Sequence, residues 1–519
     1  MILADSQTSG VATCELNLVE FWADKIRYHI ICLAKSPTRS AQRPTMSPLR
    51  KDDPIVIVGA GIFGLSTSLH LARRGYDQVT VLDKQDYDRG LYSYAKGCDA
   101  ASAAYGTQTE YQELSIEAIK LWNQWNLDLA NGEVPPGMSP SDKVFFNNGA
   151  ISFNEGDVLP PFEQATIEGA KKLGLATPLI TNDPHDIEAA RQLGFDTDQF
   201  RPKARGKAMV GILDTSGGHV AADKACRLAL HKARRLGVKF IFGAQSGTFE
   251  SLIRKGGRVV GVRTKDNQLH DAKLTIMACG AYTPVLVPEL DGLCEATAGS
   301  VAVFKIPKTS PLFERLSSRN FPIWMYKMRD GAKGGLYGFA LDSEGHFKIG
   351  YRGTKYTNPQ IQPDGKERSV PVTRWTDGQK LTQIPKQAMD TIASFVSEHI
   401  PEVLEEVGDV AFTRACWYTD TFDNHFVIDR VPNQPGLMVV TGGSGHAFKF
   451  LPNIGDRVVD IIEEVKTDHP AIQAWRWRSQ GDREPINVLM EGKKGPRALQ
   501  NVVLTGSIHG PTSKRPSML

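Results

Sequence analysis

The stretch that decides the fold is PIVIVGAGIFGLSTSLHLARRGYDQVTVLDK, residues 54–84. A β-branched run leads into three glycines, and leucines with helical spacing follow them. A second β-branched run then ends at Asp83. This order predicts a strand, a helix and a second, parallel strand.

The glycines and the acid have the spacing of a dinucleotide-binding turn. Gly59 permits the tight turn, Gly61 lets the backbone approach a pyrophosphate at the helix N-terminus, and Gly64 allows close helix packing. Asp83 follows Gly64 by 19 residues, so its carboxylate can bind a ribose hydroxyl. The acid favours a free 2′-hydroxyl and therefore FAD or NAD over NADP. A glycine-rich turn in another kind of α/β domain is the alternative.

The rest of the chain favours FAD over NAD. A nicotinamide dehydrogenase normally continues at once into further βαβ units, whereas here an irregular stretch and an amphipathic helix at 112–126 follow. The Rossmann-like pattern returns only at 223–243. The segment TIMACGAYT, 275–283, then predicts a buried strand ending in a turn that Gly280 permits. A cofactor domain split in this way suits a flavoprotein, although a purely structural strand end explains the last segment almost as well.

A third segment, LMVVTGGSGHAFKFLPNIGDRVVDII at 437–462, predicts a strand, a glycine-rich turn and a helix. The glycines of this turn are Gly442, Gly443 and Gly445. Backbone N–H groups there can hold a flavin ring edge or ribityl chain. Lys449 lies in HAFKFL, 446–451, which we interpret as an otherwise apolar helix start, and it is expected to face an anion, because an unpaired buried ammonium is costly. His446 lies beside this turn and is a candidate cofactor residue, and a purely structural role is the alternative interpretation.

Composition excludes several classes of function. The 519 residues are 41% hydrophobic and 23% charged, which is typical of a soluble globular protein with two or three domains. A formal charge of +3 without a basic block makes nucleic acid an unexpected partner. No apolar run is long enough for a membrane span. The seven cysteines lack disulfide or zinc spacing, so a reducing compartment is expected.

Five motifs resemble the monomeric sarcosine oxidase family, particularly its fungal members: fructosyl amino acid oxidases (amadoriases) and L-saccharopine or L-pipecolate oxidases. The motifs, spread over 54–463, are GAGIFG, MACGAYT, YGFALDSEGHFKIGYRG, RACWYTDTFDNHFVID and GGSGHAFKFLPNIG. The resemblance implies an α/β, two-domain FAD-dependent oxidoreductase with a Rossmann-like FAD domain and a mixed-sheet substrate domain. It also implies oxidation of the C–N bond of a secondary amino acid to an imine, with electrons passing to O₂ to give H₂O₂. We expect a monomer.

The resemblance assigns roles to single residues. Cys416 matches the cysteine that carries the flavin through a thioether, and Arg414 is placed to favour its thiolate. An inert buried cysteine is the alternative. Lys348, on the second strand of a hairpin predicted at 334–353, matches the lysine that activates O₂, since a fixed cation stabilises the developing anion. A solvated strand residue is its alternative.

The remaining candidates line the substrate and cofactor sites. The substrate residues are Tyr337, Arg352, Tyr418 and Lys449, the last as the anchor of a substrate carboxylate. The cofactor residues are Gly59, Gly61, Ile62, Phe63, Gly64, Asp83, Lys84, Val220, Gly280, Cys416, Gly443, Gly445, His446 and Lys449. No metal ligands are expected.

The motifs also predict the domain organisation. The FAD domain combines 50–106, 205–285 and 410–465, and the substrate domain combines 107–204 and 286–409. A C-terminal extension follows at 466–519. We interpret 1–45 as a disordered extension or as sequence upstream of a natural start at Met46. The final Ser-Met-Leu is a loose variant of a peroxisomal signal, so both peroxisome and cytoplasm are expected locations.

One departure from the family concerns CDAASAAYG, 98–106. Relatives carry a basic segment before the matching AYG, and this chain does not. A substrate that needs no arginine, a mis-spliced gene or a loss of activity would each produce this pattern. The alternatives to a saccharopine-, pipecolate- or sarcosine-like substrate are therefore a fructosyl amino acid and a catalytically impaired flavin-binding protein. A quinone-linked dehydrogenase is a further alternative.

Overall fold

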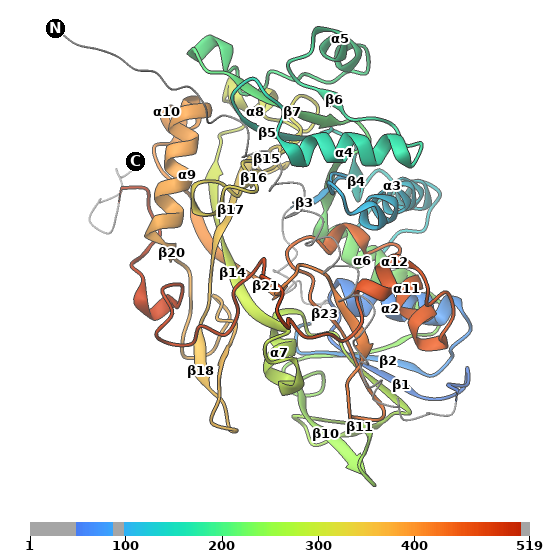
Figure 1. Ribbon diagram of the computed structural model, residues 1–519. Coiled ribbons are helices and arrows are strands. Elements are labelled where there is room, and N and C mark those ends of the chain that lie inside the picture. Colours follow the sequence, from blue (N-terminus) through green and yellow to red (C-terminus); the bar gives the residue numbers. More distant parts are fainter. Residues whose placement is uncertain (1–47, 87–97, 510–519) are drawn as a thin grey trace, which may run out of the picture. The chain divides into compact units, whose positions relative to one another are not determined.

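The computed structural model describes residues 48–86 and 98–509 (Figure 1). The expectations for 1–45 and for the Ser-Met-Leu end lie outside the described residues. In the described part of the chain, no helix combines the length and the apolar character that a bilayer span needs. The described residues combine helices with a mostly parallel sheet and a mixed sheet, as the α/β prediction requires.

A six-stranded sheet contains the dinucleotide-binding turn. Its strands, in spatial order, are β22 (Val427–Arg430), β23 (Leu437–Thr441), β13 (Leu274–Met277), β1 (Ile55–Val58), β2 (Val79–Asp83) and β9 (Lys239–Phe242). All neighbours are parallel except the edge strand β22. The predicted strand, helix and parallel strand at 54–84 are therefore confirmed, with α2 (Ile62–Arg73) between β1 and β2.

Helices cover one face of this sheet. α2 contacts α6 (Ala222–Arg235) and α11 (Ile454–Glu463). The long helix α3 (Thr109–Ala130) adds Tyr111, Trp122 and Trp125 to the same apolar core. A second core lies against Val56 and Val58, which point to the opposite face of β1. An antiparallel sheet of three strands contributes to this second core: β10 (Phe249–Lys255), β11 (Arg258–Thr264) and β12 (Leu269–Asp271).

An eight-stranded mixed sheet forms the other large layer. Its spatial order is β21 (Phe412–Thr421), β14 (Cys294–Lys305), β17 (His346–Tyr356), β16 (Leu336–Gly338), β15 (Ile323–Tyr326), β5 (Ala150–Glu155), β7 (Met209–Asp214) and β6 (Leu179–Ile180). Only β15 and β5 pair in parallel. Helices α9 (Lys386–His399) and α10 (Pro401–Val407) pack on one face over an apolar core. The predicted hairpin at 334–353 is confirmed as β16 and β17.

The other elements are short. A three-stranded sheet consists of β3 (Cys98–Ala101), β8 (Gly218–Ala221) and β4 (Phe145–Phe146). Two-stranded pairs are β18 (Pro359–Ile361) with β19 (Glu367–Ser369), and β20 (Ile384–Pro385) with β24 (Leu504–Thr505). The remaining helices are α4 (Pro161–Lys172), α5 (Pro184–Gln192), α7 (Thr283–Leu286), α8 (Pro311–Arg315) and α12 (Pro470–Ala474).

The described part of the predicted C-terminal extension contributes Trp475 and Leu499 to the two largest apolar cores. Trp475 is fully buried, and its indole N–H donates to the hydroxyl of Tyr111 at 2.9 Å. Arg478 binds Asp423 in a bidentate pair, at 2.6 and 2.8 Å. Further along, β24 pairs with β20 beside the eight-stranded sheet. The predicted domain limits stay a prediction.

An ion-pair cluster fastens α2 to α11. The Arg74 guanidinium donates to Asp456 at 2.6 Å, to Asp460 at 2.5 Å and to Glu463 at 2.9 Å. Asp460 is fully buried, so its charge depends on cations nearby. Burial alone would raise the pKa of Asp456, but the hydrogen bonds from Arg74 outweigh it and the pKa is lowered.

Replacing Arg74 by leucine should cost about 3 kcal/mol of the free energy of unfolding at neutral pH, the low end for a broken buried pair because Arg457 remains 3.6 Å from Asp460. A carboxylate with a lowered pKa stabilises the fold above its ordinary pKa and loses this effect on acidification. The difference between wild type and variant should therefore shrink as the pH falls below 3.8. Urea titrations at two pH values test this, with the exposed Arg50→Leu as control; equal costs for both variants would contradict it.

Candidate active site

The turn between β1 and α2 has room for a ligand. Gly59 has a φ of +104°, and a Cβ there would collide with the carbonyl group of Ala278. A Cβ on Gly64 would collide with the carbonyl oxygen of Gly59. Around Gly61, in contrast, no described atom lies within 4 Å of the Cβ position. No described side chain caps α2, which begins directly after Gly61, so its first N–H groups suit a pyrophosphate.

Asp83 ends β2 next to this turn, as predicted. Its carboxylate accepts the backbone N–H of Ala60 at 2.7 Å and that of Gln85 at 2.8 Å. Burial raises the pKa of Asp83. Each carboxylate oxygen keeps a second lone pair, so a ribose hydroxyl can still bind. The ammonium group of Lys84 lies 3.7 Å from the centre of the Tyr282 ring, which follows β13.

The end of β13 lies beside the same turn. Gly280 has a φ of +54° and opens the short 3₁₀ helix Gly280–Tyr282, which confirms the predicted strand and its glycine turn. The Cys279 thiol donates to the carbonyl oxygen of Val58 at 3.2 Å. Two turns from distant parts of the sequence therefore meet at the carboxyl edge of the sheet, where dinucleotides bind in open α/β sheets.

The glycine-rich turn after β23 joins the two large sheets. Ser444 is fully buried and has a φ of +46°. Its N–H donates to the carbonyl oxygen of Thr419 at 2.9 Å, and its hydroxyl accepts the N–H of Thr421 at 3.2 Å. A Cβ on Gly443 would lie 3.5 Å from the Phe63 ring. The turn is thus fixed between β21 and the start of α2.

One face of the eight-stranded sheet gathers the predicted catalytic and flavin-attachment residues. Val303 of β14 pairs with Lys348 on one side and with Phe412 on the other. Gly299, four residues earlier on β14, pairs with Cys416. Because side chains alternate between the faces of a strand, Lys348 and Cys416 lie on the same face. Cys416 is half-buried, and its thiol is free.

The predicted substrate residues share this face. Tyr337 pairs with Gly350, which lies two residues from both Lys348 and Arg352 on β17. Tyr418 lies two residues beyond Cys416 on β21. The intervening residue Ile349 points the other way, into the core under α9. The register therefore separates a buried apolar face from a face that carries the candidate residues.

The two tyrosines touch each other over glycines. Their hydroxyl oxygens, in Tyr337 and Tyr418, are 3.2 Å apart. A Cβ on Gly350 would collide with the Tyr337 ring, and one on Gly299 would lie 2.8 Å from the Tyr418 ring. Burial raises the pKa of Tyr418 well above its ordinary value, and the neighbouring Cys416 adds to this effect. Both glycines are therefore needed for the rings to lie against the sheet.

Two cations from β17 have different surroundings. Lys348 is half-buried, and its ammonium group lies 4.2 Å from the centre of the Phe339 ring. Arg352 donates to the carbonyl oxygens of Ser444 and Gly445, both at 3.2 Å. Its guanidinium group lies 6.0 Å from the Tyr418 ring. Arg352 thus holds the glycine-rich turn beside the tyrosines, and its predicted contact with substrate stays a prediction.

Lys449 and His446 both bind the junction segment at 98–106. Lys449 donates to the carbonyl oxygen of Ser102 at 2.9 Å, and its ammonium group lies 4.7 Å from the Tyr105 ring. His446 has one ring nitrogen 3.0 Å from the Asn424 carbonyl oxygen and the other 3.0 Å from the Tyr105 hydroxyl. Burial lowers the pKa of His446 to about 3. We therefore assign a neutral ring that donates from Nε2 and accepts at Nδ1.

Some candidates lie differently from expectation. Lys449 belongs to a separate 3₁₀ helix, Phe448–Phe450, and α11 begins only at Ile454, so the predicted helix start at the lysine is wrong. Val220 is fully buried on β8, which pairs with β3 and β4 outside the six-stranded sheet. Phe63 is buried in the core with its ring against Phe426, while Ile62 is half-buried at the start of α2. Val220 and Phe63 belong to the same apolar core, and the predicted cofactor contact of Val220 stays a prediction.

Sequence reasoning missed several residues near the site. Ser102 and Tyr105 gave no signal beyond the missing basic segment. Glycines at 299 and 350 inside strands do signal a close approach, which here is made by aromatic rings. A buried ion pair between Lys355 and Asp420 also lies on this side of the sheet, and the Thr297 hydroxyl donates to the same carboxylate at 2.5 Å. No local pattern links these residues.

Alanine at Gly61 should affect FAD binding, whereas alanine at Gly64 should affect folding stability. Gly61→Ala leaves the apoprotein as stable as the parent, since open space surrounds the added methyl, but lowers FAD affinity about tenfold or more by filling the path of the pyrophosphate. Gly64→Ala costs about 1–3 kcal/mol of folding stability through overpacking. Thermal unfolding of the apoproteins and FAD titration, both in a Cys416→Ala background, measure the two effects. A destabilised Gly61→Ala apoprotein would contradict the assignment.

Comparison with known proteins agrees with this geometry. Two curated relatives are the L-saccharopine oxidase of Schizosaccharomyces pombe, 28% identical over 82% of this chain and 93% of that protein, and the N-methyl-L-tryptophan oxidase of Salmonella enteritidis, 25% identical over 78% and 94%. Among solved structures, Amadoriase I from Aspergillus fumigatus has a TM-score of 0.62 at 26% identity, covering 84% of this chain and 91% of that one. A thermally stable mutant of fructosyl peptide oxidase has a TM-score of 0.70 at 25% identity, covering 88% and 99%.

These structural likenesses confirm the predicted two-domain, FAD-dependent fold class. The model of the DAO family, described as FAD-dependent oxidoreductases, matches residues 54–461, which is most of the sequence. The chain therefore belongs to the DAO family of FAD-dependent oxidoreductases.

Proposed function

We propose that this chain oxidises the secondary amine of an amino acid, using FAD and O₂ and releasing H₂O₂. Its family and relatives establish the coarser statement, an FAD-dependent amino acid oxidase acting on C–N bonds. The observation that carries the proposal is the single sheet face that presents Lys348, Cys416 and the tyrosine pair beside the glycine-rich turn.

The residues fit FAD on three counts. The uncapped N-terminus of α2 and the open space at Gly61 suit a pyrophosphate, and Asp83 suits a ribose. Bound FAD would accept the electrons of the C–N oxidation and deliver them to O₂. Cys416 is the proposed covalent attachment point, because it is a free, half-buried thiol on the face that borders the glycine-rich turn.

The chain's own groups would position the reactants. Tyr337 and Tyr418 form a wall of two rings, and the raised pKa of Tyr418 keeps its phenol neutral, which suits an amine that must be unprotonated to react. Lys348 supplies a fixed cation where O₂ gains negative charge, and a preorganised charge needs no solvent reorganisation. Lys449 is the proposed anchor of the substrate carboxylate, as the family resemblance implies, because its ammonium group brings a positive charge beside Tyr105 and the glycine-rich turn.

Two substrate classes follow from the relatives. The saccharopine oxidase and the N-methyl-tryptophan oxidase favour an N-alkyl amino acid such as saccharopine, pipecolate or sarcosine. The likeness to Amadoriase I and fructosyl peptide oxidase favours a fructosyl amino acid. We place the first class ahead because the saccharopine oxidase, at 28% identity, is more similar to this chain in sequence than the N-methyl-tryptophan oxidase, Amadoriase I or fructosyl peptide oxidase.

The junction at 98–106 supports an alternative function, that of a flavin-binding protein without catalytic activity. In its favour, Ser102 and Tyr105 contact Lys449 and hold His446. Anaerobic addition of saccharopine, pipecolate, N-methyl amino acids and fructosyl amino acids separates the two readings. An oxidase loses its flavin colour with at least one of these amines, and a scaffold keeps it with all four.

Cys416→Ala should abolish covalent flavin. Denatured wild type is expected to fluoresce on a gel under ultraviolet light after acid treatment, while the Cys416→Ala band stays dark. Cys226→Ala, which removes a buried cysteine side chain from the first core, is the matched control and should keep its fluorescence. Complete release of flavin from wild type by acid precipitation would exclude the thioether.

Lys348→Met should slow reoxidation of the reduced flavin by O₂ about a hundredfold while reduction by substrate changes little, because one preorganised charge is worth about 3 kcal/mol. Stopped-flow traces of the two half-reactions measure this. The exposed Lys333→Met is the control. Equal slowing of both half-reactions would remove the assigned role.

Lys449→Ala should raise the apparent Kd for substrate steeply while FAD stays bound, since loss of a charged partner costs about 2–5 kcal/mol. The methyl ester of the substrate should be poor for the parent enzyme. Anaerobic titration of flavin reduction with acid and ester checks both points, with the exposed Lys386→Ala as control. Equal reduction by ester and acid would show that the carboxylate is not recognised.

A further inference from the structure

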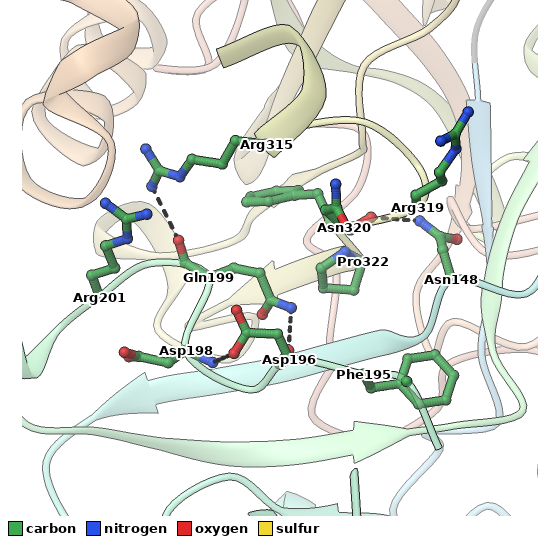
Figure 2. Close-up of a pocket in the computed structure, with 12 residues that line it drawn as sticks. Asn148, Phe195, Asp196, Asp198, Gln199, Arg201, Arg315, Arg319, Asn320 and Pro322 are labelled. Atoms are coloured by element: carbon green, nitrogen blue, oxygen red, sulfur yellow. Dashed lines mark hydrogen bonds between the residues drawn. The ribbon is translucent and has the colours of Figure 1, made fainter. Parts of the chain in front are cut away.

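A polar cavity lies near the starts of strands β5 and β15, and no candidate site residue lines it. It has a volume of about 310 Å³, near the lower limit for small-molecule sites. Its walls come from the loop after α5 and the segment after α8, with Asn148 before β5 (Figure 2). None of the predicted catalytic, substrate or cofactor residues lines it.

The cavity walls are fixed by hydrogen bonds. Asn148 donates to the carbonyl oxygen of Phe321 at 2.7 Å, and its own amide oxygen accepts the N–H of His219 at 3.1 Å. Arg315 donates to the carbonyl oxygen of Gln199 at 3.2 Å and to Glu402 at 2.9 Å. Hydrogen bonds therefore tie together the separate segments that form the cavity walls.

Charges of both signs line the cavity. Arg201 and Arg319 are exposed, and within the described ranges neither guanidinium has an ion pair or hydrogen bond. Asp196 accepts the backbone N–H of Asp198 at 2.8 Å with one carboxylate oxygen. In Figure 2, Asp196 lies at the centre below Gln199, with Arg201 and Arg319 on either side.

Gln199 supplies an acceptor that lacks a donor. This residue is 7% exposed, and its side-chain N–H donates to the carbonyl oxygen of Asp196. That bond fixes which end of the amide is the nitrogen. The side-chain oxygen, on the other end, has no hydrogen-bond partner among the described residues. A buried acceptor without a donor is unfavourable, so this polar wall of the cavity is incompletely satisfied.

We propose that this cavity binds a free α-amino acid as a zwitterion. A simple anion would meet the charge of Asp196, and a simple cation would meet the arginines. A zwitterion satisfies both: its carboxylate binds Arg201 or Arg319, while its ammonium donates to Asp196. The proposal concerns a second site and does not depend on which amine is oxidised.

Calorimetry on the anaerobic FAD-loaded protein tests the proposal with L-alanine, L-glutamate and L-lysine as zwitterions, acetate as the anion and methylamine as the cation. At least one amino acid should bind without changing the flavin absorbance, and Arg319→Gln and Asp196→Asn should each weaken it about tenfold or more, as for hydrogen bonds to charged groups. Arg191→Gln removes an exposed charge from α5 outside the cavity and should leave binding unchanged.

Three outcomes would overturn the proposal. One is that none of the amino acids binds. Another is that acetate or methylamine binds as tightly as the best amino acid, which would indicate an ion site. The third is that binding survives both substitutions at full strength, which places the ligand elsewhere. Both substituted side chains are exposed, so both variants should fold, and thermal unfolding of each variant checks this.

Discussion

The candidate site depends on the hydrogen bonds around Ser444. The carbonyl oxygen of this buried residue accepts a hydrogen bond from Arg352. Its N–H donates to the carbonyl oxygen of Thr419, and its hydroxyl accepts the N–H of Thr421. Strands from the eight-stranded sheet thus grip a turn that belongs to the six-stranded sheet. Because these bonds involve backbone groups, one buried hydroxyl and one planar guanidinium, they leave little freedom for the two sheets to shift.

Patterns of short range could be predicted from the sequence. The turn at 54–84, the hairpin that carries Lys348 and the strand before the glycine-rich turn all follow from residues close together in the chain. Periodicity and glycine spacing act within one element or between neighbours, so they report these features well. The family resemblance then added the roles of Lys348 and Cys416, which no local pattern would suggest.

Contacts between distant residues could not be predicted in this way. Lys449 reads as the start of a helix, yet it lies on its own 3₁₀ turn and binds Ser102. In the sequence, the junction at 98–106 stands out only because the basic segment of relatives is missing. The structure shows that the Tyr105 hydroxyl lies 3.0 Å from a ring nitrogen of His446. The ion pair of Lys355 with Asp420 and the polar cavity also unite residues from several segments. Such pairings arise from tertiary packing, which composition and spacing do not encode locally.

The strand order of the six-stranded sheet has a consequence for synthesis of the chain. β1 begins at Ile55, but its neighbour β13 begins at Leu274, and β13 in turn pairs with β23 at Leu437. A growing polypeptide therefore displays the apolar edge of β1 long before the strand that covers it has emerged from the ribosome. The cofactor half can close only when most of the protein has been translated, and a nascent or prematurely terminated chain carries an unpaired parallel edge that invites aggregation.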